Sequence, residues 1–220
     1  MTRFLDRRKA YELRQQGKSY SQIKKELGMS KSTLSQWLRK YPLSKEQIDM
    51  LRGKSESRIE KYRQTMQKKR LDRFTLCYEK EKMELMPFSK RELFIAGLFL
   101  YWGEGVKGDN STVSLNNTDP DVVKFYLLWL TECLNIQREM IKVIVHLYED
   151  MEIDDSLDFW SNILNIPRSQ FIKPYIKKST RLSIDQKGYG HGTCGLYLYN
   201  IEIKNRIRAG LKIITDNYAP

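Results

Sequence analysis

The sequence predicts an α+β fold in three successive parts: a bundle of three short helices, a long basic helix, and a domain whose helices cover one face of a mixed or antiparallel sheet. Three observations lead to this prediction. Glycines interrupt helical apolar spacing early in the chain, residues 55–85 contain neither proline nor glycine, and strand-like alternation is interleaved with helical patterns after residue 89. We therefore expect boundaries that give parts 1–42, 43–88 and 89–220.

The first part is expected to hold three short helices. Residues 6–16 and 21–27 have helical spacing, and Gly17 and Gly28 end these two helices, Gly28 in a tight turn that requires a positive φ. A third helix is predicted over residues 31–40. Its N-cap and its buried face are formed by Ser30 and by Leu34, Trp37 and Leu38. Three short helices with a glycine at each turn make a helix-turn-helix layout.

This segment resembles the helix-turn-helix of resolvases and transposases, which belongs to the homeodomain-like group. The residues that carry the resemblance are Gly17, Ser21, Ile23, Leu27, Gly28, Ser30, Leu34 and Leu38. In such a motif the start of the third helix points at base edges in the major groove of duplex DNA. The candidate base-reading residues are Lys31, Ser32, Thr33, Ser35 and Gln36. The candidate backbone contacts are Lys24, Lys25, Arg39 and Lys40. A small bundle with solvated charges is the alternative.

The charge of the chain is concentrated in its first part. Residues 1–90 carry 24 Lys and Arg residues against 11 Asp and Glu, whereas residues 91–220 carry 15 against 16. Such a basic half indicates nucleic-acid binding. The longest apolar stretch, residues 94–102, is too short to span a bilayer, and the N-terminus has no signal-peptide pattern, so we expect no membrane association and a cytoplasmic, nucleoid-associated protein of a bacterium or phage.

The segment 43–88 is expected to connect the two ends of the chain. A capping box at Ser44 starts a short helix that runs to about Arg52, and a long helix follows from Ser55 to about Leu85. This long helix is rich in Lys and Arg and has only a thin apolar seam. Contact with DNA phosphates, a solvated linker and one half of a dimeric coil all remain possible for it.

The last part alternates helices and strands. The predicted helices cover residues 89–103, 119–134, 156–164 and 201–215, and the predicted strands cover 112–116, 142–148, 171–177 and 196–200. This order predicts an α+β domain. No nucleophile triad, zinc-hydrolase motif or dinucleotide fingerprint is found, so no small-molecule cofactor is expected.

The first helix of this domain carries the sharpest motif of the chain. The run 94–105, which ends in Gly103-Glu104-Gly105, resembles the signature helix of LAGLIDADG homing endonucleases, and residues 113–120 resemble the strand and second helix of that family. The resemblance implies that the helix packs against a twin, that two acids hold divalent metal over the scissile phosphates, and that a chain with one motif acts as a homodimer. Glu104 then takes the catalytic and metal-binding role, with Mg²⁺ as the ion.

Members of that family read DNA with the sheet face opposite the helices. The resemblance therefore implies DNA contacts at the polar and basic residues near the predicted strands: Lys107, Lys142, His146, Lys173, Tyr175, Lys177, Lys178, Arg181 and Lys187. The segment 168–188 holds six of the basic residues of this domain against one acid.

The motif departs from the family pattern at three places. Phe99 stands where a glycine is usual, Trp102 stands where an acid is common, and the Ala96-Gly97 pair fits only a motif two residues longer. Whether the chain cuts DNA is left open for this reason. The alternative is a transcriptional regulator that joins a helix-turn-helix to a LAGLIDADG-type scaffold that no longer cuts, which the near-neutral charge of residues 91–220 favours. A recombinase or transposase accessory protein is a third possibility.

Overall fold

A computed structural model of the chain describes residues 4–51, 54–108, 111–180 and 190–218. The chain divides into two compact units, unit 1 (residues 1–86) and unit 2 (residues 87–220). Within the described residues, no helix is both long and apolar enough to cross a membrane.

Unit 1 begins with three short helices: α1 (Phe4–Gln15), α2 (Tyr20–Leu27) and α3 (Lys31–Leu38). Gly17 has a φ angle of 86° and Gly28 a φ angle of 66°, and both are positive as the predicted turns require. The three helices close around a core of Ala10, Leu13, Tyr20, Ile23, Leu34 and Leu38. Trp37 is only partly buried at the edge of this core, although its spacing with Leu34 predicted an inward position.

Helix α2 begins one residue earlier than predicted. Ser19 is its N-cap, and it forms a capping box with Gln22 because each side chain bonds the other residue's backbone N–H. The following helix α4 (Lys45–Asp49) has the predicted capping box between Ser44 and Gln47. It is shorter than expected and is followed by α5 (Lys54–Leu85).

A buried ion pair joins α5 to the three-helix bundle. Arg14 Nη2 donates to Glu60 Oε2 at 2.8 Å, and both side chains are at most 4% exposed. Arg14 also donates to the carbonyl oxygens of Tyr41 and Lys18, and Glu60 accepts from the backbone N–H of Tyr20. The compact unit therefore includes the segment 43–86, most of the predicted connector 43–88, together with the predicted helix-turn-helix 1–42.

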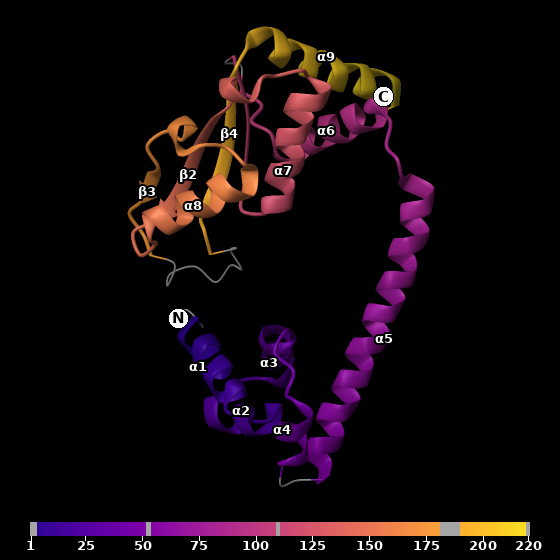
Figure 1. Cartoon of the computed structure of the whole chain (residues 1–220), viewed down its shortest axis with the longest axis vertical. Helices are drawn as coiled ribbons and strands as arrows, with labels where there is room; N and C mark the ends of the chain where they lie inside the picture. The colour runs from indigo at the N-terminus through magenta and orange to yellow at the C-terminus, as the bar shows by residue number, and fades with distance from the viewer. Residues whose placement is uncertain (1–3, 52–53, 109–110, 181–189, 219–220) are drawn as a thin grey trace. The chain divides into compact units, whose positions relative to one another are not determined.

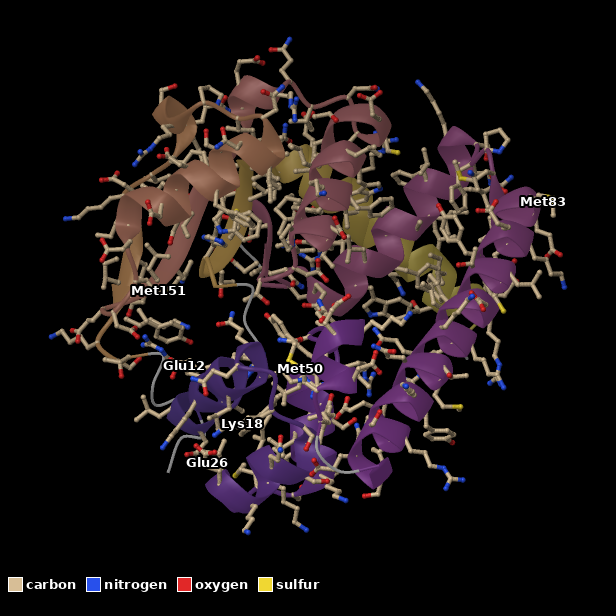
Figure 2. The ribbon with its side chains drawn as sticks, turned by 60° about the horizontal axis from the view of Figure 1, so that its bottom comes forward. Glu12, Lys18, Glu26, Met50, Met83 and Met151 are labelled. Atoms are coloured by element: carbon tan, nitrogen blue, oxygen red, sulfur yellow. The ribbon has the colours of Figure 1, made fainter. Side chains whose placement is uncertain are left out.

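The side chains of α5 beyond residue 63 are exposed. Met83, for example, projects from the helix in Figure 2 and is 78% exposed, whereas Lys18 and Glu26 lie beside each other in the bundle and form an ion pair. The first turns of α5 thus belong to the core of unit 1, and its later turns meet solvent.

Unit 2 is an α+β domain built on a four-stranded mixed sheet. Its strands are β1 (Thr112–Asn117), β2 (Lys142–Tyr148), β3 (Tyr175–Lys177) and β4 (Thr193–Tyr199), in the order β1-β4-β2-β3. The β1–β4 and β4–β2 pairs are antiparallel, and β2–β3 is parallel. The predicted strand over 171–177 is reduced to β3 and a single bridge between Phe171 and Val143, because Pro174 cannot donate to a ladder.

Helices cover one face of this sheet. Unit 2 contains α6 (Lys90–Glu104), α7 (Pro120–Leu128), α8 (Ile153–Leu164) and α9 (Ile201–Tyr218), and α7 and α8 lie across the sheet in Figure 1. Short turns η1 (Trp129–Cys133), η2 (Arg138–Met140) and η3 (Arg168–Gln170) complete the domain. The predicted helix 119–134 is present as α7 followed without a break by η1, which winds as a π-helix and has Trp129 in the core.

The sheet has one core face and one face of mixed polarity. Strand residues that alternate toward the helices are buried: Val113, Leu115, Val143, Val145, Leu147, Cys194, Leu196 and Leu198.

A buried lysine also stabilises this domain. Lys204 Nζ of α9 donates to the Tyr101 hydroxyl, the Val106 carbonyl and the Thr112 carbonyl at 2.8–3.0 Å, so its charge is shared among three oxygens.

Candidate nucleic-acid interface

Helix α3 presents an outward face opposite its buried leucines. Leu34 and Leu38 are fully buried, whereas Ser32, Gln36 and Lys40 are exposed on the other side. The 3.6-residue period of a helix places these three side chains on one face. The outward face therefore has the size and polarity of a helix that reads the major groove.

The N-terminal turn of α3 is held by a cluster of hydroxyl groups. Ser30 Oγ accepts from the backbone N–H of Thr33 at 3.1 Å, and it lies 2.8 Å from both Ser32 Oγ and Thr33 Oγ1. The hydroxyls of Ser32 and Thr33, which we predicted to read bases, are thus already engaged with the cap. Lys31 and Gln36 are left as the exposed predicted side chains with long reach.

The predicted backbone contacts of unit 1 lie on its surface. Lys24 and Lys25 are exposed in the last turn of α2, and Arg39 and Lys40 are exposed just after α3. Cationic side chains around the outward face are what the phosphates of a duplex require.

Helix α5 adds residues to this surface that our list of base- and backbone-contacting residues omitted. Arg63 lies over the ring of Tyr20 at 3.8 Å, and its Nη1 lies 3.4 Å from Ser35 Oγ of α3. Burial raises the pKa of the Tyr20 phenol, and the positive charges of Arg14 and Arg63 act against that rise. No local pattern places Arg63 beside α3, because the two lie 28 residues apart in the chain.

In unit 2, Glu104 is the last residue of α6 and is exposed. Asn117 Nδ2 of β1 donates to its carboxylate at 3.4 Å, a long bond. Within the described residues, no group of three or more His, Cys, Asp or Glu side chains converges anywhere as metal ligands do. Glu104 is thus an exposed carboxylate outside any such group.

Helix α6 has a buried side and an apolar exposed side. On the buried side Gly97 lies against Trp129, whose Nε1 donates to the Phe94 carbonyl at 3.1 Å. On the exposed side Ile95, Phe99 and Trp102 follow one another at helical spacing and are 37%, 50% and 36% exposed. Phe99, which departs from the family pattern, is thus part of an apolar stripe of Ile95, Phe99 and Trp102, which we call the α6 stripe.

The second sheet face gathers several of the predicted DNA-contacting residues. The strand register places Lys142, His146, Tyr175 and Lys177 on this face, together with Tyr148 and Tyr197. Lys177 Nζ lies 5.2 Å from the centre of the Tyr148 ring, and His146 packs against Tyr175. Burial lowers the pKa of His146, and the charge of Lys177 adds to that effect.

The remaining predicted contacts of unit 2 are scattered. Lys107 is exposed after α6, and Lys173 and Lys178 are exposed on either side of β3. Arg181 and Lys187 lie outside the described residues. The structure therefore brings Lys142, His146, Tyr175 and Lys177 together. Lys107 follows the segment that bonds to β1, at the opposite edge of the sheet from β3.

Comparison with known proteins identifies the first segment only. Residues 1–44 match the model of a homeodomain-like domain. No curated protein matches the chain, and no solved structure matches it. The helix-turn-helix at the N-terminus suggests binding to double-stranded DNA.

Proposed function

We propose that this chain binds a specific sequence of duplex DNA with α3 as its recognition helix, and that unit 2 pairs with a second copy through the α6 stripe. The observation that carries the first part is the exposed surface of α3, where Gln36 on the outward face and Lys31 in the first turn stay exposed while the neighbouring hydroxyls are used by the cap. A Gln side chain pairs with adenine through two hydrogen bonds in the major groove.

The test of sequence reading begins with selection of bound duplexes from a random pool by the full chain. We expect one preferred site, and we expect Gln36→Ala to lose about 1–3 kcal/mol of discrimination at one base pair of that site. Gln15→Ala on α1 is the matched control, since Gln15 is exposed and does not lie on α3. A pool that returns no preferred sequence would reject sequence-specific reading by this chain.

The pairing of two copies is supported by the α6 stripe and by the single acid beside it. Exposed aromatic and branched side chains at helical spacing are typical of surfaces that bind another chain. A two-fold axis through α6 brings the Glu104 residues of the two copies together, which one copy cannot do alone. We expect Phe99→Glu to convert a dimer to a monomer in sedimentation, whereas Met140→Glu, equally exposed on η2, leaves the dimer intact.

We further propose that the paired domain descends from a metal-dependent DNA endonuclease of the LAGLIDADG type. Mg²⁺ binds through one or two carboxylates together with water and substrate phosphates, so Glu104 of each copy would supply one such carboxylate. The ion would stabilise the negative charge that develops on a scissile phosphate. Glu104 would hold it, and Asn117 orients that carboxylate.

One plasmid assay distinguishes a nuclease that cleaves DNA from a transcriptional regulator that only binds it. A supercoiled plasmid that carries the selected site is incubated with the chain and with Mg²⁺ or Mn²⁺. Nicking that disappears in Glu104→Gln but remains in Glu139→Gln, at unchanged binding, supports a nuclease. Binding without nicking by any variant supports the second candidate, a transcriptional regulator, which the near-neutral charge of residues 91–220 favours.

A further inference from the structure

A cavity of about 140 Å³ lies between α3 and α5 in unit 1. A single water needs only about 15 Å³ of such space, so a larger group can enter. Its lining includes Ser35 and Arg39 on one side and Arg63, Gln67 and Arg70 on the other, together with apolar side chains such as Leu38 and Met66. Arg39, Gln67 and Arg70 are exposed, so this cavity is accessible from solvent.

The walls of the cavity carry positive charge that the protein does not neutralise. Arg14 and Glu60 also line the cavity, but they form a buried pair with each other at 2.8 Å. In the part of unit 1 that the structure describes, no carboxylate lies within ion-pair distance of Arg39, Arg63 or Arg70. Three guanidinium groups that have no carboxylate partner favour the binding of an anion with several oxygens.

One of the three arginines is already oriented. Arg63 is half-buried, and its guanidinium is stacked on the Tyr20 ring at 3.8 Å. A stacked guanidinium keeps its N–H groups available at its edge, and less rotamer freedom is lost when it binds. Its Nη1 lies 3.4 Å from Ser35 Oγ, a long bond that a stronger acceptor can replace.

The position of the cavity beside α3 indicates the source of the anion, since this side of α3 would face the DNA backbone. Ser35 and Arg39 are one turn apart on the flank of α3, whereas Ser32, Gln36 and Lys40 occupy its outward face. Helix α5 packs beside that flank and leaves the outward face uncovered. A major groove is about 12 Å wide and is bordered by phosphates, so groups on the flank of an inserted helix lie at the height of the DNA backbone.

We propose that Arg39, Arg63 and Arg70, with Ser35, bind one phosphate of the DNA backbone beside the recognition helix. This inference rests on the proposed insertion of α3 into the major groove. It makes α5 a part of the DNA-reading surface, where it sets the depth and register of α3. The arginine contacts add affinity without adding sequence preference.

The test uses the full chain and the duplex selected by the wild-type protein. Binding is measured by fluorescence anisotropy from 0.05 to 0.5 M salt for wild type, Arg63→Gln, Arg70→Gln and the control Arg58→Gln. Loss of one phosphate contact lowers the slope of log K against log salt by about 0.9. Extrapolated from 1 M salt, this slope change corresponds to binding about fivefold weaker at 0.15 M salt. Because three arginines share one phosphate, we expect a loss of up to that size for Arg63→Gln and for Arg70→Gln, and no change for Arg58→Gln, which also lies on α5 but not in the cavity wall.

A chemical probe on the DNA supplies an independent readout. Duplexes with a single neutral methylphosphonate are scanned across the site, and wild type should lose affinity at one linkage, where the loss in Arg70→Gln should be smaller. Arg70 is exposed, so its substitution does not disturb the core even if Arg63→Gln weakens the fold. Equal slopes for the cavity variants and Arg58→Gln, or the same methylphosphonate loss in wild type and Arg70→Gln, would overturn the inference. Failure of the wild-type chain to bind any duplex would instead overturn the proposed function.

Discussion

The contact between Gly97 and Trp129 allows one stability prediction to be worked out in full. Trp129 is fully buried, and its indole lies directly over Gly97 of α6. A methyl group at position 97 would overlap three atoms of that ring, so Gly97→Ala must displace the indole. The displacement also breaks the hydrogen bond from Trp129 Nε1 to the Phe94 carbonyl, which is 3.1 Å long.

Three contributions decide the size of the effect. Overpacking of a filled core costs about 1–3 kcal/mol. An indole N–H that loses its buried partner costs about 1–3 kcal/mol more. Alanine in a helix returns about 1 kcal/mol relative to glycine. We therefore expect Gly97→Ala to lower the free energy of unfolding of unit 2 by about 3 kcal/mol.

Urea denaturation followed by tryptophan fluorescence measures this change, since three of the four tryptophans lie in unit 2. Gly103→Ala is the matched control on the same helix. A Cβ at Gly103 meets nothing within 4 Å, so this variant should be stabilised by up to about 1 kcal/mol through helix propensity alone. The reasoning is refuted if both variants shift the urea midpoint in the same direction.

Three further predictions concern both units. Lys40→Ala should weaken binding to every duplex alike and lower the salt slope by about 0.9, as measured by anisotropy, because an exposed lysine beside α3 contacts phosphate rather than bases. Glu60→Gln leaves Arg14 charged and buried, so it should cost unit 1 about 3–5 kcal/mol in a circular-dichroism melt, whereas Glu56→Gln should cost little. The pKa of His146 in the folded chain lies below its ordinary 6.5, so the unfolded state takes up the proton first and unit 2 loses stability as the pH falls below about 6.5; His146→Asn should flatten that dependence in urea titrations between pH 7 and 5.

Much of the local structure follows from short-range chemistry and was predicted for that reason. The breaks at Gly17 and Gly28 depend on backbone freedom at one residue, and the capping box of Ser44 depends on two side chains three residues apart. The helix start at Ser19 carries the same signal, a serine three residues before Gln22, which the prediction of a start at Ser21 overlooked. The base-contact candidates on α3 rest on the helix-turn-helix layout and stay a prediction.

The structure corrects the predictions wherever a distant segment competes with a local pattern. Residues 119–134 have helical spacing throughout, yet the helix changes to a π-turn at Trp129, where the indole occupies the space over Gly97. Residues 171–177 alternate as a strand does, but Pro174 cannot donate and only β3 is paired. In the first case the packing of Trp129 accompanies the change, whereas in the second case the proline lies within the segment, so the sequence carried a signal that the prediction overlooked.

The sequence alone was enough to predict a basic helix-turn-helix at the N-terminus and an α+β second part, because charge, periodicity and caps act over a few residues. The sequence did not indicate the cavity between α3 and α5. Arg14 meets Glu60 across 46 residues, and Arg63 meets Ser35 across 28, so these partners become neighbours only when the helices pack. The same packing makes an apparent connector one wall of that cavity.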